Sequence, residues 1–203
     1  MTGSRFDRLG GLFKRHGHRV YPGWVRDLFS LFVLRLSRGA RLLDLGGGTG
    51  LLASWAQKHR PDLELWVADP SEGMLAYVED GVHAVQARAE ALPFEDGYFH
   101  AVAIGEALHH FQDVGRALDE VARVLGPSGK VWVYDYDPRP LPGRMVRFLE
   151  RLWGEPASFL PPDRLQAMLE ERGFRSHLQQ RGFRYVLVAE FKEKASGRSS
   201  PSV

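Results

Sequence analysis

Four glycines within five positions mark the part of the chain best suited to chemistry. The stretch LLDLGGGTG covers residues 42–50 and places Asp44 just before Gly46, Gly48 and Gly50. Glycine loses more conformational entropy on folding than any other residue, so such a cluster is costly unless the backbone needs it. We interpret this turn as a place where a ligand lies directly on the main chain.

Two common phosphate-binding motifs do not fit this turn. A P-loop needs a lysine after its last glycine, and none stands here. The dinucleotide fingerprint G-x-G-x-x-G needs a glycine where this chain has Leu51, which disfavours a nicotinamide oxidoreductase. The pattern that remains is D-x-G-x-G-x-G.

The elements that position this turn follow from the apolar pattern. Short apolar runs predict strands at 40–45, 63–70, 82–87, 100–105, 130–137, 174–182 and 183–193. Helical spacing and end signals predict helices at 24–36, 49–60, 71–80, 113–126, 144–153 and 161–173. Strands that alternate with helices and lack polar alternation are typical of a parallel sheet covered on both faces. The predicted fold class is therefore α/β: a Rossmann-like, doubly wound sheet of seven strands, mostly parallel, with a C-terminal antiparallel hairpin.

The motif resembles the first motif of the class I S-adenosylmethionine (SAM) methyltransferases. Three further stretches resemble the next motifs of the small type-11 group, which is related to ubiquinone and menaquinone C-methylation enzymes: VADPSEGML, ARAEALPFEDGYFHAVAIGEALHHFQD and LDEVARVLGPSGKVWVYD. They occur in the family order, and the resemblance covers about residues 6–193. It implies SAM as the cofactor and methyl transfer as the activity.

The resemblance also implies which residues contact the cofactor. Asp69 would accept from both ribose hydroxyls, with helix capping as its structural alternative. Pro70 and Met74 would pack on the adenine, and ordinary packing in the hydrophobic core is the structural alternative for both. The family often has aspartate where Arg88 stands, so Glu90 or a backbone carbonyl would receive the adenine amino group.

Further positions complete the implied cofactor site. Ala89 lies at the adenine edge, and Gly105 is a backbone contact for the methionine part of SAM. Asp44 would anchor the glycine turn and the cofactor's ammonium group. Tyr21, in VYPGW, resembles a tyrosine that some relatives place over the cofactor.

Catalytic residues are harder to identify, because positioning alone drives much of a methyl transfer. The candidates are Glu106, His109 and His110, followed by Tyr134 and Asp135 at the end of a predicted strand. Adjacent histidines on a helix point about 100° apart, so a structural role is the alternative reading for both. The same geometry does not suit two metal ligands from one helix, so we expect no metal.

Composition narrows the class of protein. The chain has 203 residues and no cysteine, and the absence of cysteine excludes cysteine chemistry. Its formal net charge of only +2 argues against a dense nucleic-acid-binding face. Neither a secretory signal nor a stretch long enough for a membrane span is visible. We therefore expect a cytoplasmic protein with one domain at 1–193, including a lid segment at 1–23, and a disordered tail at 194–203.

The leading hypothesis is methylation of a small, apolar or aromatic acceptor at carbon or oxygen. Aromatic and apolar side chains in segments 4–23 and 138–162 would close a pocket over the reacting centre. The alternatives are a non-catalytic SAM-binding protein and an RNA-modifying enzyme that uses Arg144, Arg147 and Arg151 as a phosphate-binding face. The oligomeric state stays open.

Overall fold

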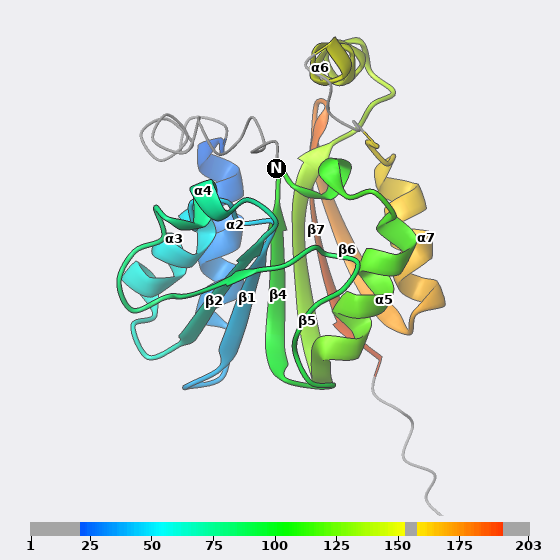
Figure 1. Ribbon diagram of the computed structural model, residues 1–203. Coiled ribbons are helices and arrows are strands. Elements are labelled where there is room, and N and C mark those ends of the chain that lie inside the picture. Colours follow the sequence, from blue (N-terminus) through cyan, green and yellow to red (C-terminus); the bar gives the residue numbers. More distant parts are fainter. Residues whose placement is uncertain (1–20, 153–157, 193–203) are drawn as a thin grey trace, which may run out of the picture.

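The strand order of the sheet brings the predicted site together. The computed structural model describes residues 21–152 and 158–192. Its strands are β1 (Arg41–Leu45), β2 (Glu64–Asp69), β3 (His83–Gln86), β4 (Phe99–Gly105), β5 (Leu125–Tyr136), β6 (Phe174–Arg181) and β7 (Arg184–Phe191). They form one sheet in the order β3-β2-β1-β4-β5-β7-β6 (Figure 1). After β1 the chain continues to β2 and β3 on one side of β1, whereas β4 lies on its other side. The boundary between β1 and β4 is therefore the switch point at which such sheets bind ligands.

The predicted fold class is confirmed by the pairing of the strands. β1 pairs in parallel with β2 and β4, and β5 pairs in parallel with β4. β7 runs antiparallel to both β5 and β6, as the predicted hairpin requires. The carboxyl ends of β1, β2, β4 and β5 therefore meet at one edge of the sheet.

Helices cover both faces of the sheet. They are α2 (Gly23–Leu34), α3 (Leu51–His59), α4 (Glu72–Leu75), the 3-10 helix η3 (Leu108–His110), α5 (Val114–Val124), α6 (Leu141–Leu152) and α7 (Pro162–Glu171). One buried cluster joins α2 and α3 to Leu42 of β1 and Trp132 of β5. The other joins α5 and α7 to Leu43 of β1 and Val133 of β5. Neighbouring residues of one strand thus serve opposite cores, which explains why the buried strands are apolar throughout.

Most predicted element boundaries lie within two residues of the observed ones, and larger differences occur at α4, β5 and α6. The helix expected at 71–80 is α-helical only over Glu72–Leu75, because the amides of Tyr77 and Val78 bond to carbonyls three residues back. The helix expected to end at Gly126 ends at Val124. β5 begins at Leu125 instead of residue 130, and its pairing with β4 shifts register between Phe99 and Ala101. α6 begins at Leu141 and not at residue 144.

Some predictions fall on residues that the structure does not describe. The lid segment 1–23 lies outside the described residues except for its last three positions, and the tail 194–203 lies wholly outside them. Within the described ranges, no helix has both the length and the apolar character needed to cross a bilayer.

Candidate functional site

The glycine turn between β1 and α3 has a backbone that side chains would block. Gly46 and Gly48 have φ angles of +69° and +55°, in the left-handed region that L residues rarely adopt. A Cβ atom on Gly46 would lie 2.6 Å from the Cβ of Ala107, and one on Gly48 would lie 2.9 Å from the Cε of Met74. The turn is thus enclosed by β4's following loop on one side and by α4 on the other. Gly50, at φ +76°, precedes α3.

Asp44 lies buried beneath this turn. Its side chain is 1% exposed, and its Oδ2 accepts a hydrogen bond from the backbone amide of Ala53 at 3.1 Å. Its Oδ1 has no hydrogen-bond partner among the described residues. Burial raises the pKa of Asp44 to about 7, and backbone hydrogen bonds from Ala53 and Leu52 offset this only in part. An acceptor left in this state is suited to a cationic or hydrogen-bond-donating ligand.

Asp69, at the end of β2, faces the glycine turn. Its Oδ2 accepts from the amide of Gly48 at 2.9 Å, and its Oδ1 accepts from the amide of Ser71 at 2.8 Å. The capping bond of α4 comes from a different residue, because the Ser71 hydroxyl accepts from the amide of Met74. The alternative role considered for Asp69 was to cap the next helix, and in the structure Ser71 caps that helix.

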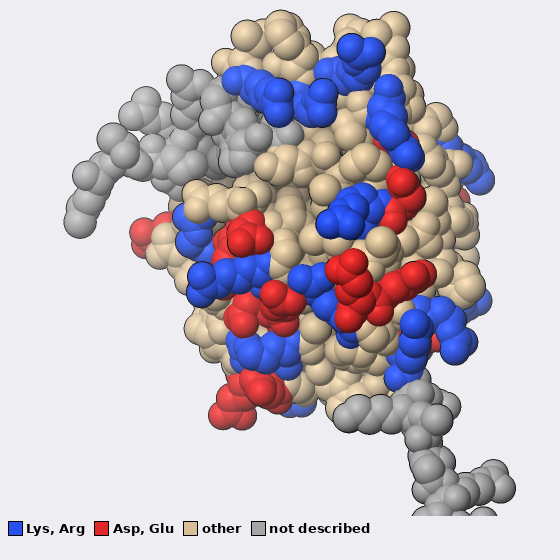
Figure 2. All heavy atoms as spheres, turned by 90° about the vertical axis from the view of Figure 1, so that its right-hand side faces the viewer, with Lys and Arg blue, Asp and Glu red and all other residues tan. Residues whose placement is uncertain are grey.

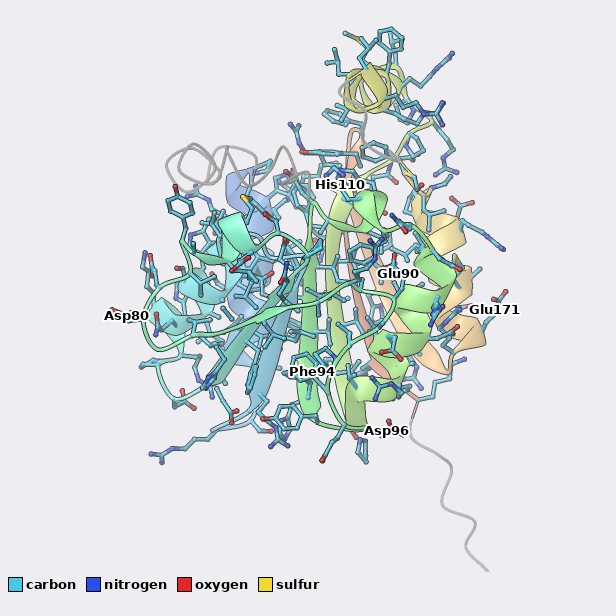
Figure 3. The ribbon with its side chains drawn as sticks, in the orientation of Figure 1. Asp80, Glu90, Phe94, Asp96, His110 and Glu171 are labelled. Atoms are coloured by element: carbon cyan, nitrogen blue, oxygen red, sulfur yellow. The ribbon has the colours of Figure 1, made fainter. Side chains whose placement is uncertain are left out.

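The remaining adenine-side candidates are spread around α4 and the loop after β3. Met74 and Ala89 are buried, whereas Pro70 is exposed. Glu90 is held at the start of α5, because its Oε1 accepts from the amides of Gln112 at 2.7 Å and Asp113 at 3.2 Å (Figure 3). One oxygen of Glu90 therefore already orders the loop before α5, while its Oε2 lies 3.6 Å from Nε of Arg88.

Tyr21 lies over the end of β4. Its ring packs against Trp55 and Tyr134, with ring centroids 5.2 and 5.1 Å apart, and only 7% of the residue is exposed. The Tyr21 hydroxyl occupies the space that a side chain at Gly105 would fill. Burial, and then the nearby Glu106 and Asp44 carboxylates, raise the pKa of Tyr21. The structure thus brings Tyr21 against Gly105 and near Asp44. Their contacts with the cofactor stay predictions.

Glu106 joins a network of tyrosines at the ends of β4 and β5. It has a φ of +53°, and its carboxylate accepts a hydrogen bond from the Tyr136 hydroxyl. Tyr134 in turn hydrogen-bonds Tyr136 and Arg184. Burial raises the pKa of Glu106 to about 7, with the bond from Tyr136 offsetting part of the effect. A carboxyl group with this pKa can gain or lose a proton near neutral pH.

Tyr136 is a site residue that the sequence reasoning missed. Successive side chains of a strand point to opposite faces, so Tyr134 and Tyr136 share a face. That spacing, together with the position at the end of a predicted strand, was the available signal. The candidates from the sequence include Tyr134 and Asp135, and the same alternation carried one residue further reaches Tyr136.

His109 pairs with Asp135 on the other side of the β5 end. Their Nδ1 and Oδ1 atoms are 2.8 Å apart, and the residues are only 3% and 1% exposed. The His109 ring also stacks on Phe159, with centroids 4.1 Å apart, and its carbonyl accepts from the amide of Ser158. His109 is therefore a well-ordered side chain that ties η3 to β5 and to the segment before α7.

His110 has a different environment from its neighbour. It ends η3 at the carboxyl edge of the sheet (Figure 3). Burial, and then the neighbouring His109, lower the pKa of His110 to about 3, so its imidazole is neutral at physiological pH. Within the described ranges, no group of three or more metal-ligating side chains is arranged to hold a metal ion. Metal independence itself stays a prediction.

Comparison with known proteins identifies relatives of this chain. Residues 43–133 match the model of a methyltransferase domain family. The chain is 33% identical over 141 residues to the ubiquinone/menaquinone biosynthesis C-methyltransferase UbiE of Chromobacterium violaceum, a match that covers 66% of this chain and 56% of that protein. The chain thus spans little more than half the length of the curated relatives that it matches.

Solved structures share the fold. The YcgJ protein of Bacillus subtilis is 28% identical, with a TM-score of 0.65 over 75% of this chain and 70% of that one. A SAM-dependent methyltransferase of Thermotoga maritima is 21% identical, with a TM-score of 0.70 over 92% of this chain and 98% of that one. The second likeness concerns the fold alone.

The raised pKa of Glu106 predicts a pH dependence of stability. Between its ordinary pKa of 4.5 and its folded value of about 7, Glu106 keeps its proton in the folded chain and loses it in the unfolded one. Its contribution to the free energy of unfolding is therefore largest below about pH 4.5 and is lost as the pH rises to 7. At about 1.4 kcal/mol per pKa unit, the loss is at most about 3.5 kcal/mol.

Urea unfolding at several pH values between 5 and 8 measures this effect. Glu106→Gln should make the decline in stability shallower without removing it, because the raised pKa of Asp44 contributes over the same window. The exposed control Glu95→Gln should leave the decline as in the native chain. An equally steep decline in the Glu106 variant would show that Glu106 is ionised in the folded protein.

Proposed function

Because the chain belongs to the SAM-dependent methyltransferase family, we propose that it transfers a methyl group from SAM to a small, apolar or aromatic molecule. The observation that carries this proposal is the pairing of a side-chain-free turn with the buried, half-satisfied carboxylate of Asp44. When bound, SAM supplies a methyl group that is already activated by its positive sulfur. The residues present fit it, and each has a distinct part.

Asp44 and Asp69 are proposed to hold the two ends of the cofactor. The partnerless Oδ1 of Asp44 suits the ammonium of the methionine end, which would relieve the cost of an unsatisfied buried acceptor. The Asp69 carboxylate, held in place by two backbone amides, suits the ribose hydroxyls. Gly46, Gly48 and Gly105 let Ala107, Met74 and Tyr21 approach the main chain closely, so the walls of the proposed cofactor site pack directly on the backbone.

Methylation at a C–H or O–H position releases one proton, and Glu106 is the proposed residue to receive it. It lies at the end of β4, and its pKa of about 7 allows it to be ionised before the reaction and protonated after it. His109 is committed to Asp135 through Nδ1, and we propose that it orients η3. His110 is too weak a base for the role at neutral pH, given its pKa of about 3.

The acceptor atom and acceptor class rest on chemistry and on the relatives. The matched relatives are C-methyltransferases of quinone biosynthesis by name, which supports carbon as the acceptor atom. Buried aromatic side chains near the site, Tyr21, Tyr136 and Phe159, support an apolar or aromatic acceptor. Leu141, Met145 and Phe148, which the sequence reasoning placed over the pocket, are instead exposed on α6.

Cofactor binding can be tested by calorimetry. We expect SAM and S-adenosylhomocysteine to bind one per chain and NAD not to bind. Asp69→Ala should weaken SAM at least tenfold, because charge-assisted hydrogen bonds worth about 1.5–3 kcal/mol are lost. The exposed control Asp27→Ala should bind as the native chain does, and thermal melts should verify that both variants fold. Tighter binding of NAD than of SAM would refute the assignment.

Transfer of the methyl group is a separate test. The native chain is incubated with methyl-labelled SAM and a cell extract, which is then separated into RNA, water-soluble and solvent-soluble fractions. We expect the label in solvent-soluble small molecules, and at least tenfold less of it with Asp69→Ala at a SAM concentration below the dissociation constant of the native chain. Label in RNA alone would favour the RNA-modifying alternative, and no transfer to any fraction would favour a non-catalytic SAM-binding protein.

A further inference from the structure

Helix α6 carries most of the exposed apolar side chains of the described structure. Among the described residues, eight large hydrophobic residues are exposed. Five of the eight lie on α6: Leu141 at 70%, Met145 at 58%, Phe148 at 62%, Leu149 at 50% and Leu152 at 64%. Isolated exposed apolar residues are ordinary, but a contiguous group of them marks an interaction surface.

These five side chains form one stripe that faces away from the protein. At about 100° per residue, they fall within an arc of about 100° on the helix. The residues that hold α6 to the body lie on the other side of the helix. Val146 packs against the core, and Gly143 approaches the carbonyl of Asp137 so closely that a Cβ would collide with it. α6 thus reverses the usual arrangement, in which the apolar stripe of a surface helix faces the core.

Three arginines border the stripe. Arg144, Arg147 and Arg151 follow one another at helical spacing, and none forms an ion pair with a residue whose side chain the structure describes. Figure 2 shows basic side chains grouped at the upper end of the molecule, where α6 lies in Figure 1, with the acidic side chains mainly below them. The net charge of the whole chain is only +2, so the positive character is local.

The helix stands at the same end of the sheet as the candidate site. It follows directly on β5 and lies above the carboxyl ends of the central strands (Figure 1). The chain before it is anchored by the ion pair between Arg139 and Asp137 at 2.8 Å. The chain after it is anchored by the bond from the Ser158 amide to the carbonyl of His109. A partner on the outer face of α6 would therefore lie at the same end of the sheet as the candidate site, on the far side of α6 from it.

We propose that α6 docks the protein on an anionic lipid bilayer, with its apolar stripe in the acyl boundary and its arginines at the headgroup phosphates. Charge complementarity favours this occupant, because an apolar stripe bordered by three arginines matches both layers of such a surface. Protein interfaces also carry arginine and polar rims around an apolar core, so the oligomeric state measured below decides between a lipid surface and a second copy of the chain. RNA would leave the five apolar residues uncovered. The docking stands independently of methyl transfer, since it uses none of the cofactor residues.

Vesicle sedimentation with the full chain, in the absence of SAM, tests this proposal. The probes are vesicles of phosphatidylcholine alone and vesicles of phosphatidylcholine and phosphatidylglycerol in equal parts. We expect at least tenfold stronger binding to the anionic vesicles, weakening as the ionic strength rises. Phe148→Glu should reduce that binding at least tenfold, and replacing Arg144, Arg147 and Arg151 together by glutamine should remove the preference for anionic lipid.

Two matched controls separate α6 from general surface effects. Leu31→Glu changes a residue that is 52% exposed on α2, and it should bind as the native chain does. Glutamine at Arg35, Arg38 and Arg175, which are exposed at the opposite end of the sheet, should keep the lipid preference. Because Phe148 is exposed, its variant should melt at the native temperature.

Three results would overturn the proposal. The first is no binding of the native chain to anionic vesicles above its binding to neutral ones. The second is equal binding by the native chain and Phe148→Glu. The third is a dimer in analytical ultracentrifugation that Phe148→Glu converts to a monomer, which would assign the stripe to a second copy of the chain. None of these readouts involves methyl transfer, so they leave the proposed function untouched.

Discussion

The buried carboxylate of Asp44 is the constraint on which the site depends. One of its oxygens is bonded to the amide of Ala53 in α3, and the other has no partner in the described part of the chain. A Cβ on Gly47 would lie 2.5 Å from its Cγ, so the turn folds tightly around the carboxyl group. An unsatisfied buried acceptor costs about 1–3 kcal/mol. The protein therefore carries a local cost at the point where a cationic ligand would remove it.

Three further carboxylates lie near Asp44 along the same edge of the sheet and add to the negative charge there. Asp44, Asp69, Glu106 and Asp135 stand at or just beyond the ends of β1, β2, β4 and β5. Repulsion from Asp69 adds to the raised pKa of Asp44, and repulsion from Asp135 adds to that of Glu106. Neighbouring negative charges that raise the pKa values of Asp44 and Glu106 favour a positively charged occupant. SAM, with a sulfonium and an ammonium group, meets that requirement, whereas NAD, with its two phosphates, does not.

Much of this architecture could be predicted from the sequence, because it depends on local signals. The apolar runs that end at Asp44 and Asp69 reveal strands, and the glycines between 46 and 50 reveal the turn. The pairing of His109 with Asp135 and of Glu106 with Tyr136 could not be predicted, because these contacts join loops to strand ends far along the chain. The same holds for Glu90, whose bonds to the amides of Gln112 and Asp113 depend on how β3's following loop crosses α5. The outward stripe of α6 was visible as a helical pattern, but the direction it faces depends on Val146 and Gly143.

The central claim is that Asp44 is held ready for the cationic end of SAM. The most direct measurement is a carbon-13 NMR titration of the Asp44 carboxyl in the free chain and in the chain saturated with S-adenosylhomocysteine, which keeps the ammonium group. The account predicts a pKa of about 7 for Asp44 in the free chain and a decrease of about one to three units on binding, because an adjacent positive charge stabilises the carboxylate. The same pKa with and without the ligand would contradict it.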